Sequence, residues 1–284
     1  MSARLDTVAA LIGDTTPCER TALGGGDLST LWRLRFASGR DVVVKEGGEA
    51  EKEAAMLRAI SATGVHVPPV LAVGNGLLVL GYVPSHGLND AGWVSLGQTM
   101  RQLHDAPQPA RYGWMCDYAF GTVPVVNRWA TDWRDFWRDS RLKPCLSFLP
   151  RVLAARIAHL MRDLDRFLPA SPRPALLHGD LWTGNVLTTD RAPAGGRSEG
   201  GSPSSTQVVL IDPACYIGDA GADFGILTLF STPPHAFWEA YGALPEGFAQ
   251  SIGVYRLWPA LVHYRLFGDG YLGMVDACLD ALEL

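Results

Sequence analysis

The chain has 284 residues, of which 48% are hydrophobic and 19% charged, and its formal net charge at pH 7 is −5. This composition excludes a largely disordered protein, because such chains carry too little apolar surface to form a core. A net-negative chain also has no overall attraction to nucleic acids or anionic membranes, so we expect neither as a partner. The basic residues comprise 21 arginines and only three lysines, Lys45, Lys52 and Lys143. Each lysine is therefore a candidate for a specific role.

The N-terminal sequence and the cysteines indicate the cellular compartment in which the protein is expected. Residues 1–16 have no basic segment followed by a long apolar stretch, so they predict an ordinary helix rather than a signal peptide. No stretch approaches the roughly 18 uninterrupted apolar residues of a membrane-spanning helix. The five cysteines are scattered without C-x-x-C spacing, which favours neither a zinc site nor a disulfide framework. We expect a cytoplasmic protein with reduced thiols.

The first 83 residues predict a small β-rich unit. Short β-prone runs around a turn-rich tetrapeptide indicate a hairpin, and apolar spacing of the helical period indicates one helix, which ends at Thr63-Gly64. In chain order, the predicted elements are the glycine-rich segment 24–27, the hairpin at 31–36 and 41–45, the helix over 49–62 and a buried strand at 77–82. Pro84 and Gly87 then break the chain.

Helical apolar spacing dominates after Pro84. The predicted helices span 94–104, 129–142 and 152–167 and resume from about 219, with strand-like runs at 175–177 and 207–211. Between the two strand-like runs, residues 190–206 are rich in Ala, Pro, Gly and Ser and have almost no apolar bulk. Such a segment cannot bury enough surface to order itself, so we expect a mobile loop at the tip of a hairpin.

The strongest chemical signal is the sequence L-H-G-D-L-W-T-G-N at 177–185. Asp180 precedes Asn185 by five residues, and the later apolar run 208–211 ends at Asp212. Phosphoryl transfer needs a carboxylate that accepts the proton of the attacking hydroxyl, and hard oxygen ligands that hold Mg²⁺ against the phosphates. Asp180, Asn185 and Asp212 fit these roles in the chain order of the protein-kinase catalytic loop and its metal-binding aspartate.

The N-terminal unit supplies candidates for the nucleotide side. Gly24-Gly25-Gly26, before a strand, allows backbone N–H groups to approach a phosphate closely. Lys45 ends the run V-V-V-K, as the strand lysine of kinases does, and Glu53 in the following predicted helix can pair with it. Taken alone, Lys45 is better explained as a strand-end lysine that reaches solvent. The order of glycine segment, lysine, glutamate and catalytic loop favours the nucleotide-binding interpretation.

These motifs resemble those of the fructosamine kinase (ketosamine-3-kinase) family, which is related to aminoglycoside phosphotransferases and shares the protein-kinase-like fold. The family's form of the catalytic loop, H-G-D-L-W-x-G-N, corresponds to residues 178–185. Further matches, in chain order, are Gly25-Gly26-Asp27, the stretch 53–57, the family's D-P-A-x-Y-x-G-D at 212–219, Ala222-Asp223, His263 and the F-G-D-G-Y-L ending within 266–272. The resemblance spans nearly the whole chain.

The resemblance implies an α+β protein with a protein-kinase-like two-lobe fold. Residues 1–83 would form the ATP-binding lobe, a small antiparallel β-sheet with one helix. Residues 84–284 would form the larger, mainly helical lobe that carries catalysis and substrate binding. We therefore expect the boundary between the two lobes close to Pro84.

The resemblance also implies ATP-dependent phosphorylation of a sugar hydroxyl, expected to be the 3-hydroxyl, of a ketosamine such as a fructosamine or a ribulosamine. Such a reaction serves the deglycation of amines and proteins, with ATP and Mg²⁺ as cofactors and a ketosamine or glycated amine as small-molecule partner. By position, Asp180 would be the base, and Asn185 and Asp212 the metal ligands. The nucleotide-binding residues would be Gly24, Gly25, Gly26, Lys45, Glu53, Gly81 and Tyr82.

Four further residues have a functional and a structural interpretation. Trp182 offers an aromatic face to the substrate but is equally explained as a packed tryptophan. His263 is a candidate for a polar substrate contact, or a hydrogen-bonded core histidine. We expect His178 to brace the catalytic loop, and Asp223 to anchor that loop through hydrogen bonds.

Two other function classes remain open from the sequence. An aminoglycoside- or choline-type phosphotransferase would share the residues on the ATP side, and usually adds clustered carboxylates for a cationic substrate. The helical spacing of Asp132, Asp135 and Asp139 favours a solvated face over such a cluster. A non-catalytic binding protein with a kinase fold is the second alternative, and the intact set of Lys45, Asp180, Asn185 and Asp212 argues against it.

Overall fold

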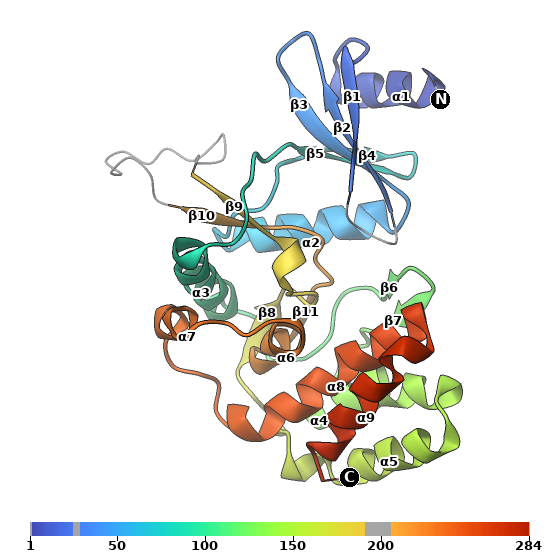
Figure 1. Ribbon diagram of the computed structural model, residues 1–284, viewed down its shortest axis with the longest axis vertical. Coiled ribbons are helices and arrows are strands. Elements are labelled where there is room, and N and C mark those ends of the chain that lie inside the picture. Colours follow the sequence, from blue (N-terminus) through green and yellow to red (C-terminus); the bar gives the residue numbers. More distant parts are fainter. Residues whose placement is uncertain (1, 25–28, 191–205, 284) are drawn as a thin grey trace.

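The computed structural model describes residues 2–24, 29–190 and 206–283, arranged as two lobes along the long axis of the molecule (Figure 1). The N-terminal lobe is a five-stranded antiparallel sheet in the order β1-β2-β3-β5-β4. Its strands are β1 (Glu19–Leu23), β2 (Thr30–Arg35), β3 (Asp41–Glu46), β4 (Val70–Gly74) and β5 (Leu77–Gly81). The predicted hairpin at 31–36 and 41–45 is the β2–β3 pair.

Two helices pack on this sheet, where the sequence placed only the helix over 49–62 and left the packing of the N-terminal helix open. Helix α1 (Ser2–Ile12) places Val8 and Ala9 against Val42 and Val44 of β3, and α2 (Ala50–Ala62) places Ala54 and Leu57 against the other face. Because side chains alternate along a strand, Lys45 lies on the same face of β3 as Val43, the face that α2 covers. The alternation of the run V-V-V-K thus aims the lysine at α2.

The C-terminal lobe is mainly helical. Its helices are α3 (Asp90–Asp105), α4 (Trp133–Trp137), α5 (Arg151–Arg162), α6 (Gly221–Phe230), α7 (His235–Tyr241), α8 (Phe248–Phe267) and α9 (Leu272–Asp280). Three antiparallel strand pairs join them: β6 (Tyr118–Phe120) with β7 (Val123–Val125), β8 (Pro174–Leu177) with β11 (Tyr216–Asp219), and β9 (Val186–Thr189) with β10 (Gln207–Leu210). Fully buried aromatic side chains from α4, α6 and α8 fill the core of this lobe.

Two predicted helices are shorter than the apolar spacing indicated. The helix expected over 129–142 begins only at Trp133, after Asp132 caps it, and continues beyond α4 as a π-helix at Arg138–Leu142. The helix expected over 152–167 ends at Arg162 and is followed by a 3₁₀ turn at Leu164–Arg166. In both cases the apolar residues outside the α-helix still pack into the core, so periodicity alone extended the prediction too far.

The strand-like runs that frame the predicted loop do form a hairpin. Strands β9 and β10 pair with Thr189 opposite Gln207, and Thr206 Oγ1 donates to Asp190 Oδ1 across 3.1 Å. The loop predicted at 190–206 lies almost entirely outside the described residues, since 191–205 are not described. Among the described helices, none combines the length and apolar character needed to cross a membrane.

Candidate active site

Three charged side chains meet between the lobes. Lys45 Nζ lies 2.7 Å from Glu53 Oε2 on α2 and 3.0 Å from Asp212 Oδ1, in the connection after β10. Lys45 and Glu53 are buried, whereas the Asp212 side chain keeps 31% of its exposure. The predicted pairing of Lys45 with the helix glutamate is therefore present, and the interpretation of Lys45 as a solvent-exposed lysine is wrong.

Burial and charge act against each other on this trio. Burial alone would lower the pKa of Lys45, but the carboxylates of Glu53 and Asp212 outweigh it and raise that pKa, so the ammonium stays charged. Burial raises the pKa of Glu53, and the neighbouring Lys45 opposes the rise. Glu53 Oε1 is buried without a hydrogen-bond partner among the described residues. The trio is thus a largely buried charge cluster in which Glu53 Oε1 can still accept a hydrogen bond.

The catalytic loop brings Asp180 and Asn185 into direct contact. Asn185 Nδ2 donates to the backbone oxygen and to Oδ2 of Asp180, both at 2.9 Å. Burial raises the pKa of Asp180 to about 7, although the hydrogen bond from Asn185 opposes the rise. A carboxylate whose pKa lies near neutrality is suited to accept a proton in general base catalysis. Oδ1 of Asp180 makes no hydrogen bond within the described residues.

Asn185 and Asp212 lie next to each other. The backbone N–H of Ile211 donates to the carbonyl of Asn185 across 3.1 Å, which joins the end of the catalytic loop to the segment before Asp212. Asp212 has a φ of +53°, a left-handed conformation that aspartate tolerates better than most residues but that still costs free energy. Strain of this kind persists where the surroundings hold it, which here are the Lys45 ion pair and the adjoining loop.

His178 braces the loop through both ring nitrogens. Its Nδ1 accepts the backbone N–H of Asp180 at 3.3 Å, so Nε2 carries the proton and donates to the carbonyl of Ile211 at 3.0 Å. Burial lowers the pKa of His178, which keeps the imidazole neutral. Both nitrogens are thus engaged inside the protein, which fits a bracing role and leaves neither available for proton transfer.

Asp223, on α6, holds the start of the same loop. Its two oxygens accept the backbone N–H groups of His178 and Gly179, each at 2.8 Å. Gly179 has a φ of +79°, and a Cβ there would lie 2.0 Å from the carbonyl oxygen of Ala214, so only glycine fits. The predicted anchoring role of Asp223 therefore has its hydrogen bonds in place.

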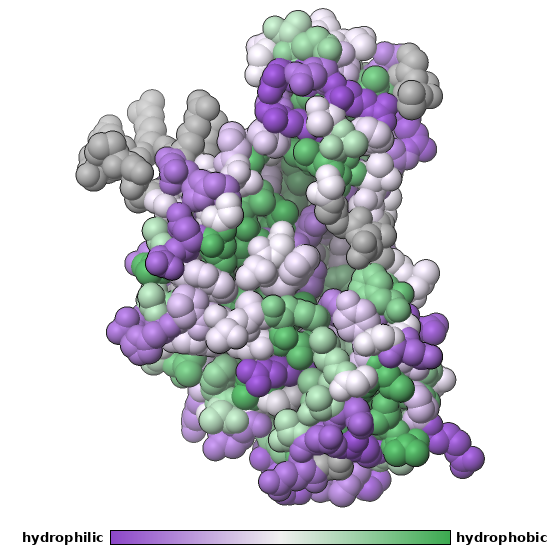
Figure 2. Space-filling view, viewed as in Figure 1, coloured by the Kyte–Doolittle hydropathy of each residue, from purple (hydrophilic) through white to green (hydrophobic). Residues whose placement is uncertain are grey.

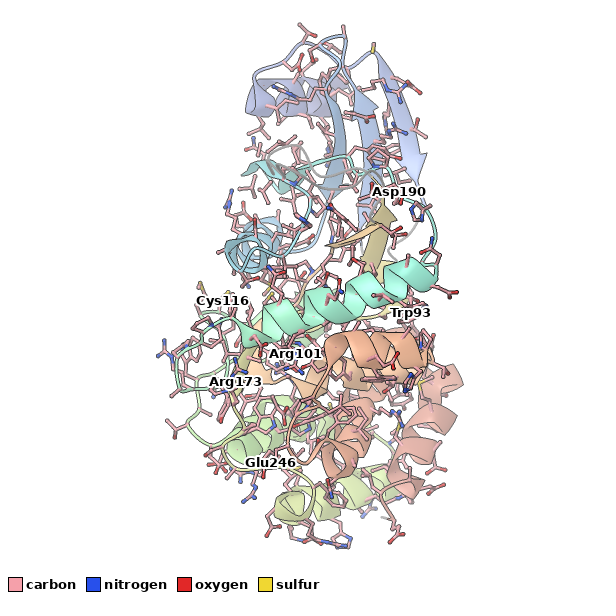
Figure 3. The ribbon with its side chains drawn as sticks, turned by 90° about the vertical axis from the view of Figure 1, so that its left-hand side faces the viewer. Trp93, Arg101, Cys116, Arg173, Asp190 and Glu246 are labelled. Carbon is pink, nitrogen blue, oxygen red and sulfur yellow. The ribbon has the colours of Figure 1, made fainter. Side chains whose placement is uncertain are left out.

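The sequence did not point to the partners of Asp223. His104 on α3 lies 3.1 Å from Asp223 through Nε2 and 3.0 Å from the hydroxyl of Tyr241 through Nδ1. Arg101, one turn earlier on α3, donates to the carbonyl of Tyr241 at 2.7 Å and fixes α3 against α7 (Figure 3). The only available signal was a histidine on the apolar face of an amphipathic helix, because the partners lie more than 100 residues away.

A second buried carboxylate, Asp219 at the end of β11, has a purely internal set of partners. It accepts the backbone N–H of Gly221 at 2.9 Å and the hydroxyl of Tyr255 at 2.7 Å. Tyr255 in turn accepts from the indole N–H of Trp133 at 2.8 Å. Burial raises the pKa of Asp219. This network joins α4, α8 and β11 beneath the site.

Gly81 and Tyr82, predicted to bind the nucleotide and located at the hinge between the lobes, use their backbone N–H groups within the protein. The N–H of Gly81 donates to Pro69 at 2.9 Å, and that of Tyr82 donates to Asp41 at 3.0 Å. An adenine base at this hinge would therefore have to contact carbonyl groups or a later N–H. Of the predicted glycine segment, only Gly24 is described, and Gly25 and Gly26 lie outside the described residues.

The two predicted substrate residues differ in their surroundings. Trp182 remains 42% exposed, and its indole lies so close to Gly184 that a Cβ there would be 2.2 Å from the ring. His263 is half-buried, with Nδ1 2.8 Å from the carbonyl of Pro259 and its ring between Phe230 and Tyr271. Trp182 is thus available to a ligand, whereas His263 has partners of its own.

The aspartates of the α4 region are also engaged locally. Asp132 accepts the backbone N–H groups of Arg134 and Asp135 as the N-terminal cap of α4. Asp135 and Asp139 both pair with Arg138, at 2.8 and 3.0 Å. They form a neutralised surface group, as the helical spacing indicated, rather than a carboxylate cluster for a cationic substrate.

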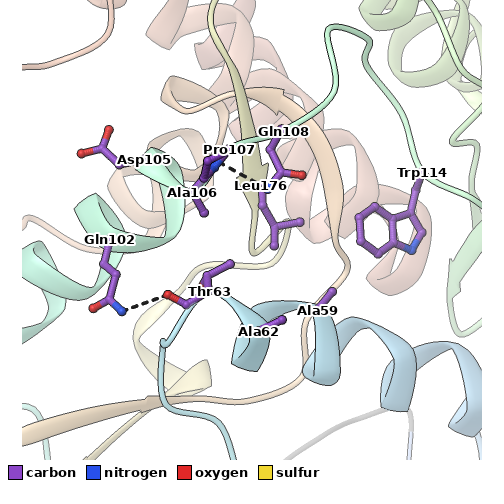
Figure 4. A pocket seen from close by; sticks show the side chains of 10 residues that line it. All are labelled: Ala59, Ala62, Thr63, Gln102, Asp105, Ala106, Pro107, Gln108, Trp114 and Leu176. Atoms are coloured by element: carbon purple, nitrogen blue, oxygen red, sulfur yellow. Dashed lines mark hydrogen bonds between the residues drawn. The ribbon is translucent and has the colours of Figure 1, made fainter.

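The site lies in the hollow between the lobes, which the space-filling view shows beneath the N-terminal sheet (Figure 2). A separate cavity of about 650 Å³ lies between the C-terminal ends of α2 and α3 (Figure 4). Thr63, Gln102 and Trp114 are among its lining residues, and none of the predicted site residues lines it. This cavity is therefore not the place of the chemistry described above.

The molecule has two lobes, a strand lysine paired to a helix glutamate, and a loop that joins Asp180 to Asn185. These features define a phosphotransferase of the protein-kinase-like class. The sequence profile of the fructosamine kinase family matches residues 3–283, and the chain belongs to this family. The expected fold class is thereby confirmed. As a member, the protein is an ATP-dependent phosphotransferase that uses a hydroxyl group as acceptor.

Individual relatives agree with the family assignment. A Thermus thermophilus protein named "Probable ketoamine kinase" is 33% identical over 263 residues, which cover 91% of this chain and 92% of that protein. The Escherichia coli protein of the same name is 31% identical over 280 residues, with 93% and 92% covered. A crystal structure from Thermobifida fusca, assigned to the fructosamine-3-kinases, superposes with a TM-score of 0.83 at 25% identity and covers 99% of both chains.

Proposed function

We propose that the protein phosphorylates a sugar hydroxyl, the 3-hydroxyl, of a ketosamine such as a fructosamine or a ribulosamine. The observation that carries this proposal is the Asp180–Asn185 contact beside Asp212, within the H-G-D-L-W-x-G-N form of the catalytic loop. The names of the relatives, ketoamine kinases, support the same acceptor class. The corresponding role in a cell is the removal of sugars from glycated amines and proteins.

The residues present suit a divalent cation. The nitrogen of the Asn185 side chain is committed to Asp180, which leaves its oxygen for a metal, and Asp212 adds a partly exposed carboxylate. No group of three or more His, Cys, Asp or Glu side chains suited to a metal occurs in the described part of the chain. Mg²⁺ in kinases typically takes one or two protein oxygens and completes its shell with phosphates and water. Asn185 and Asp212 would hold such an ion, which would neutralise charge on the phosphates.

On this proposal, the side chains of the site have separate roles in the reaction. Lys45, held by Glu53, presents an ammonium where the phosphates of ATP would lie. Oδ1 of Asp180 accepts the proton of the acceptor hydroxyl while the hydroxyl oxygen attacks the γ-phosphorus, the bond from that phosphorus to the bridging oxygen breaks, and ADP leaves. His178 and Asp223 keep the backbone of the loop in place, so Asp180 needs little reorganisation during the reaction.

A panel of acceptors tests the proposal. Purified protein with Mg-ATP is offered a fructosamine, a ribulosamine, an aminoglycoside and choline, and ADP formation is measured for each. We expect turnover with at least one of the two ketosamines. The kcat/KM for the aminoglycoside and for choline should be at least a hundredfold lower than the kcat/KM for that ketosamine. Preference for the aminoglycoside or choline would contradict the proposed substrate, and absence of turnover with all four would contradict a ketosamine kinase altogether.

We further propose that the protein works in the cytoplasm. All five cysteines are free thiols, and three of them, Cys145, Cys215 and Cys278, are buried. Free thiols of this kind are typical of reducing compartments, where disulfides rarely persist. Fractionation of cells that express the full chain checks this point.

A further inference from the structure

Helix α2 packs against both lobes. One of its faces lies on the sheet through Ala54 and Leu57. Met56 and Ile60 are fully buried instead in the hydrophobic core of the C-terminal lobe. Since residues three and seven positions apart lie on the same side of a helix, Met56 and Ile60 share a face with Glu53. Figure 1 shows α2 between the sheet and the strands β8 and β11, so this second face is the one that meets the C-terminal lobe.

The segment from Leu210 to Cys215, which includes Asp212, is bonded to α2 and to the connection that follows it. The backbone N–H of Leu210 donates to the carbonyl of His66 at 3.0 Å. The backbone N–H of Cys215 donates to Sδ of Met56 at 3.3 Å. The two ends of the segment are therefore held on the α2 side, two residues before Asp212 and three residues after it.

Two further N–H groups of the same segment are bonded to the catalytic loop. Ile211 donates to the carbonyl of Asn185 at 3.1 Å, and Ala214 donates to the carbonyl of His178 at 2.8 Å. The backbone on each side of Asp212 is thus fixed both to α2 and to the catalytic loop. These bonds hold the left-handed conformation of Asp212 in place and leave its side chain outside the backbone network.

Met56 differs from the other three acceptors because its acceptor atom belongs to a side chain. A backbone carbonyl is supplied by any residue, whereas a thioether sulfur, a weak and polarisable acceptor, is supplied only by methionine. Met56 and Cys215 are both fully buried, and the N–H of Cys215 makes no other hydrogen bond within the described residues. Without the sulfur, this N–H would be buried without a partner, which costs free energy.

We propose that Met56 is a positioning residue for Asp212. Its sulfur fixes the backbone after Asp212 against α2, one helical turn from Glu53, so that the carboxylate stays aligned with Lys45 and with a cation bound beside the phosphates. The side chain of Asp212 can then exchange Lys45 for the cation while its backbone stays in place. The inference rests on the proposed function for what Asp212 binds, but not for how its backbone is held.

The test is Met56→Leu, which keeps a buried apolar side chain of similar volume and removes the acceptor. Met100→Leu is the matched control. Met100, on α3, is equally buried in the same core, and its sulfur makes no hydrogen bond in the part of the chain that the structure describes. Both variants lose one thioether from the core, and only Met56→Leu removes the partner of Cys215.

Hydrogen exchange in the free protein measures the contact itself. Labelling with ¹⁵N-cysteine gives one amide signal for each of the five cysteines, and the exchange rate of Cys215 is followed by NMR. We expect this amide to exchange about tenfold faster in Met56→Leu, the effect of one lost hydrogen bond, and to be unchanged in Met100→Leu. An unchanged rate in Met56→Leu would overturn the inference.

The affinity for Mg-ATP, measured by calorimetry without an acceptor, then tests the positioning role. The Kd should rise roughly three- to tenfold in Met56→Leu and stay the same in Met100→Leu. Faster exchange of Cys215 with an unchanged Kd would show that Met56 has a structural role only, and an equal rise in both variants would show a general loosening of the core. Neither measurement needs a ketosamine, so failure of the unmodified protein to use ketosamines contradicts the proposed function and leaves this test intact.

Discussion

The two sides of the site are held together in different ways. The Lys45–Glu53–Asp212 trio joins the lobes through charges, and one of its members is partly exposed. The Asp223–His178–His104 network lies inside the C-terminal lobe, where the hydrogen bonds of Asp223 to His104, His178 and Gly179 are buried. The charged trio can exchange partners when phosphates and a cation arrive, whereas the buried network has no partner to exchange. On the proposed function, we therefore expect nucleotide binding to rearrange the charged trio while the catalytic loop stays fixed.

Asp180 lies where these two regions meet, so its substitution has the largest expected effect. In Asp180→Asn the amide cannot accept the proton of the acceptor hydroxyl, and kcat should fall by about 10²–10⁴-fold. The affinity for ATP, measured by calorimetry, should change little, because Asp180 is not one of the groups assigned to the nucleotide. Turnover near that of the unmodified protein would remove Asp180 as the base.

Lys45→Met breaks the charged trio and should have the next largest effect. It leaves Glu53 buried without its cation, so kcat/KM for ATP should fall by roughly a hundredfold and stability by about 3 kcal/mol. Lys52→Met is the matched control, since Lys52 pairs only with Glu49 on the surface at 2.8 Å. The assignment of Lys45 fails if the two variants show similar kinetics with ATP.

Asp223→Asn breaks the buried network instead. One of its two bonds to the loop N–H groups is lost, which should destabilise the protein by about 2 kcal/mol and lower kcat about tenfold. Asp219→Asn is the comparison, because Asp219 is equally buried but contacts no residue of the catalytic loop. Chemical denaturation should show similar losses of stability for both, with the loss in kcat confined to Asp223→Asn. Equal losses in kcat would show that Asp223 acts only through stability.

The smallest effect is expected for the segment of the chain that joins β9 to β10. Replacing residues 191–205 by Gly-Gly should leave kcat and both KM values within about twofold, because β9 and β10 already pair up to Thr189 and Gln207. The measurement is the same ADP assay at saturating and limiting ATP. A loss of tenfold or more would give this segment a part in the reaction.

Local patterns predicted well which side chains meet at the candidate site, and predicted poorly the partners that are distant in sequence. Lys45, Glu53, Asp180, Asn185 and Asp212 lie together as their motifs indicated, because each motif fixes a short stretch of backbone. His104 and its partner Asp223 are separated by 119 residues, and no local pattern links them.

Short strands were missed for the same physical reason. β6 and β7 contain three residues each, and their position depends on the distant Arg141 rather than on their own propensities. Helix α1 was expected as a helix, but its packing on the sheet was not.

The most direct test of the central claim is the position of the phosphate in the product. The product of the preferred ketosamine is isolated and the coupling of phosphorus to each sugar carbon is measured by NMR, with Asp180→Asn as the blank. We predict phosphate on the oxygen of carbon 3 with the unmodified protein, and no product above background with Asp180→Asn. Phosphate on another position, or transfer that does not depend on Asp180, would contradict the account.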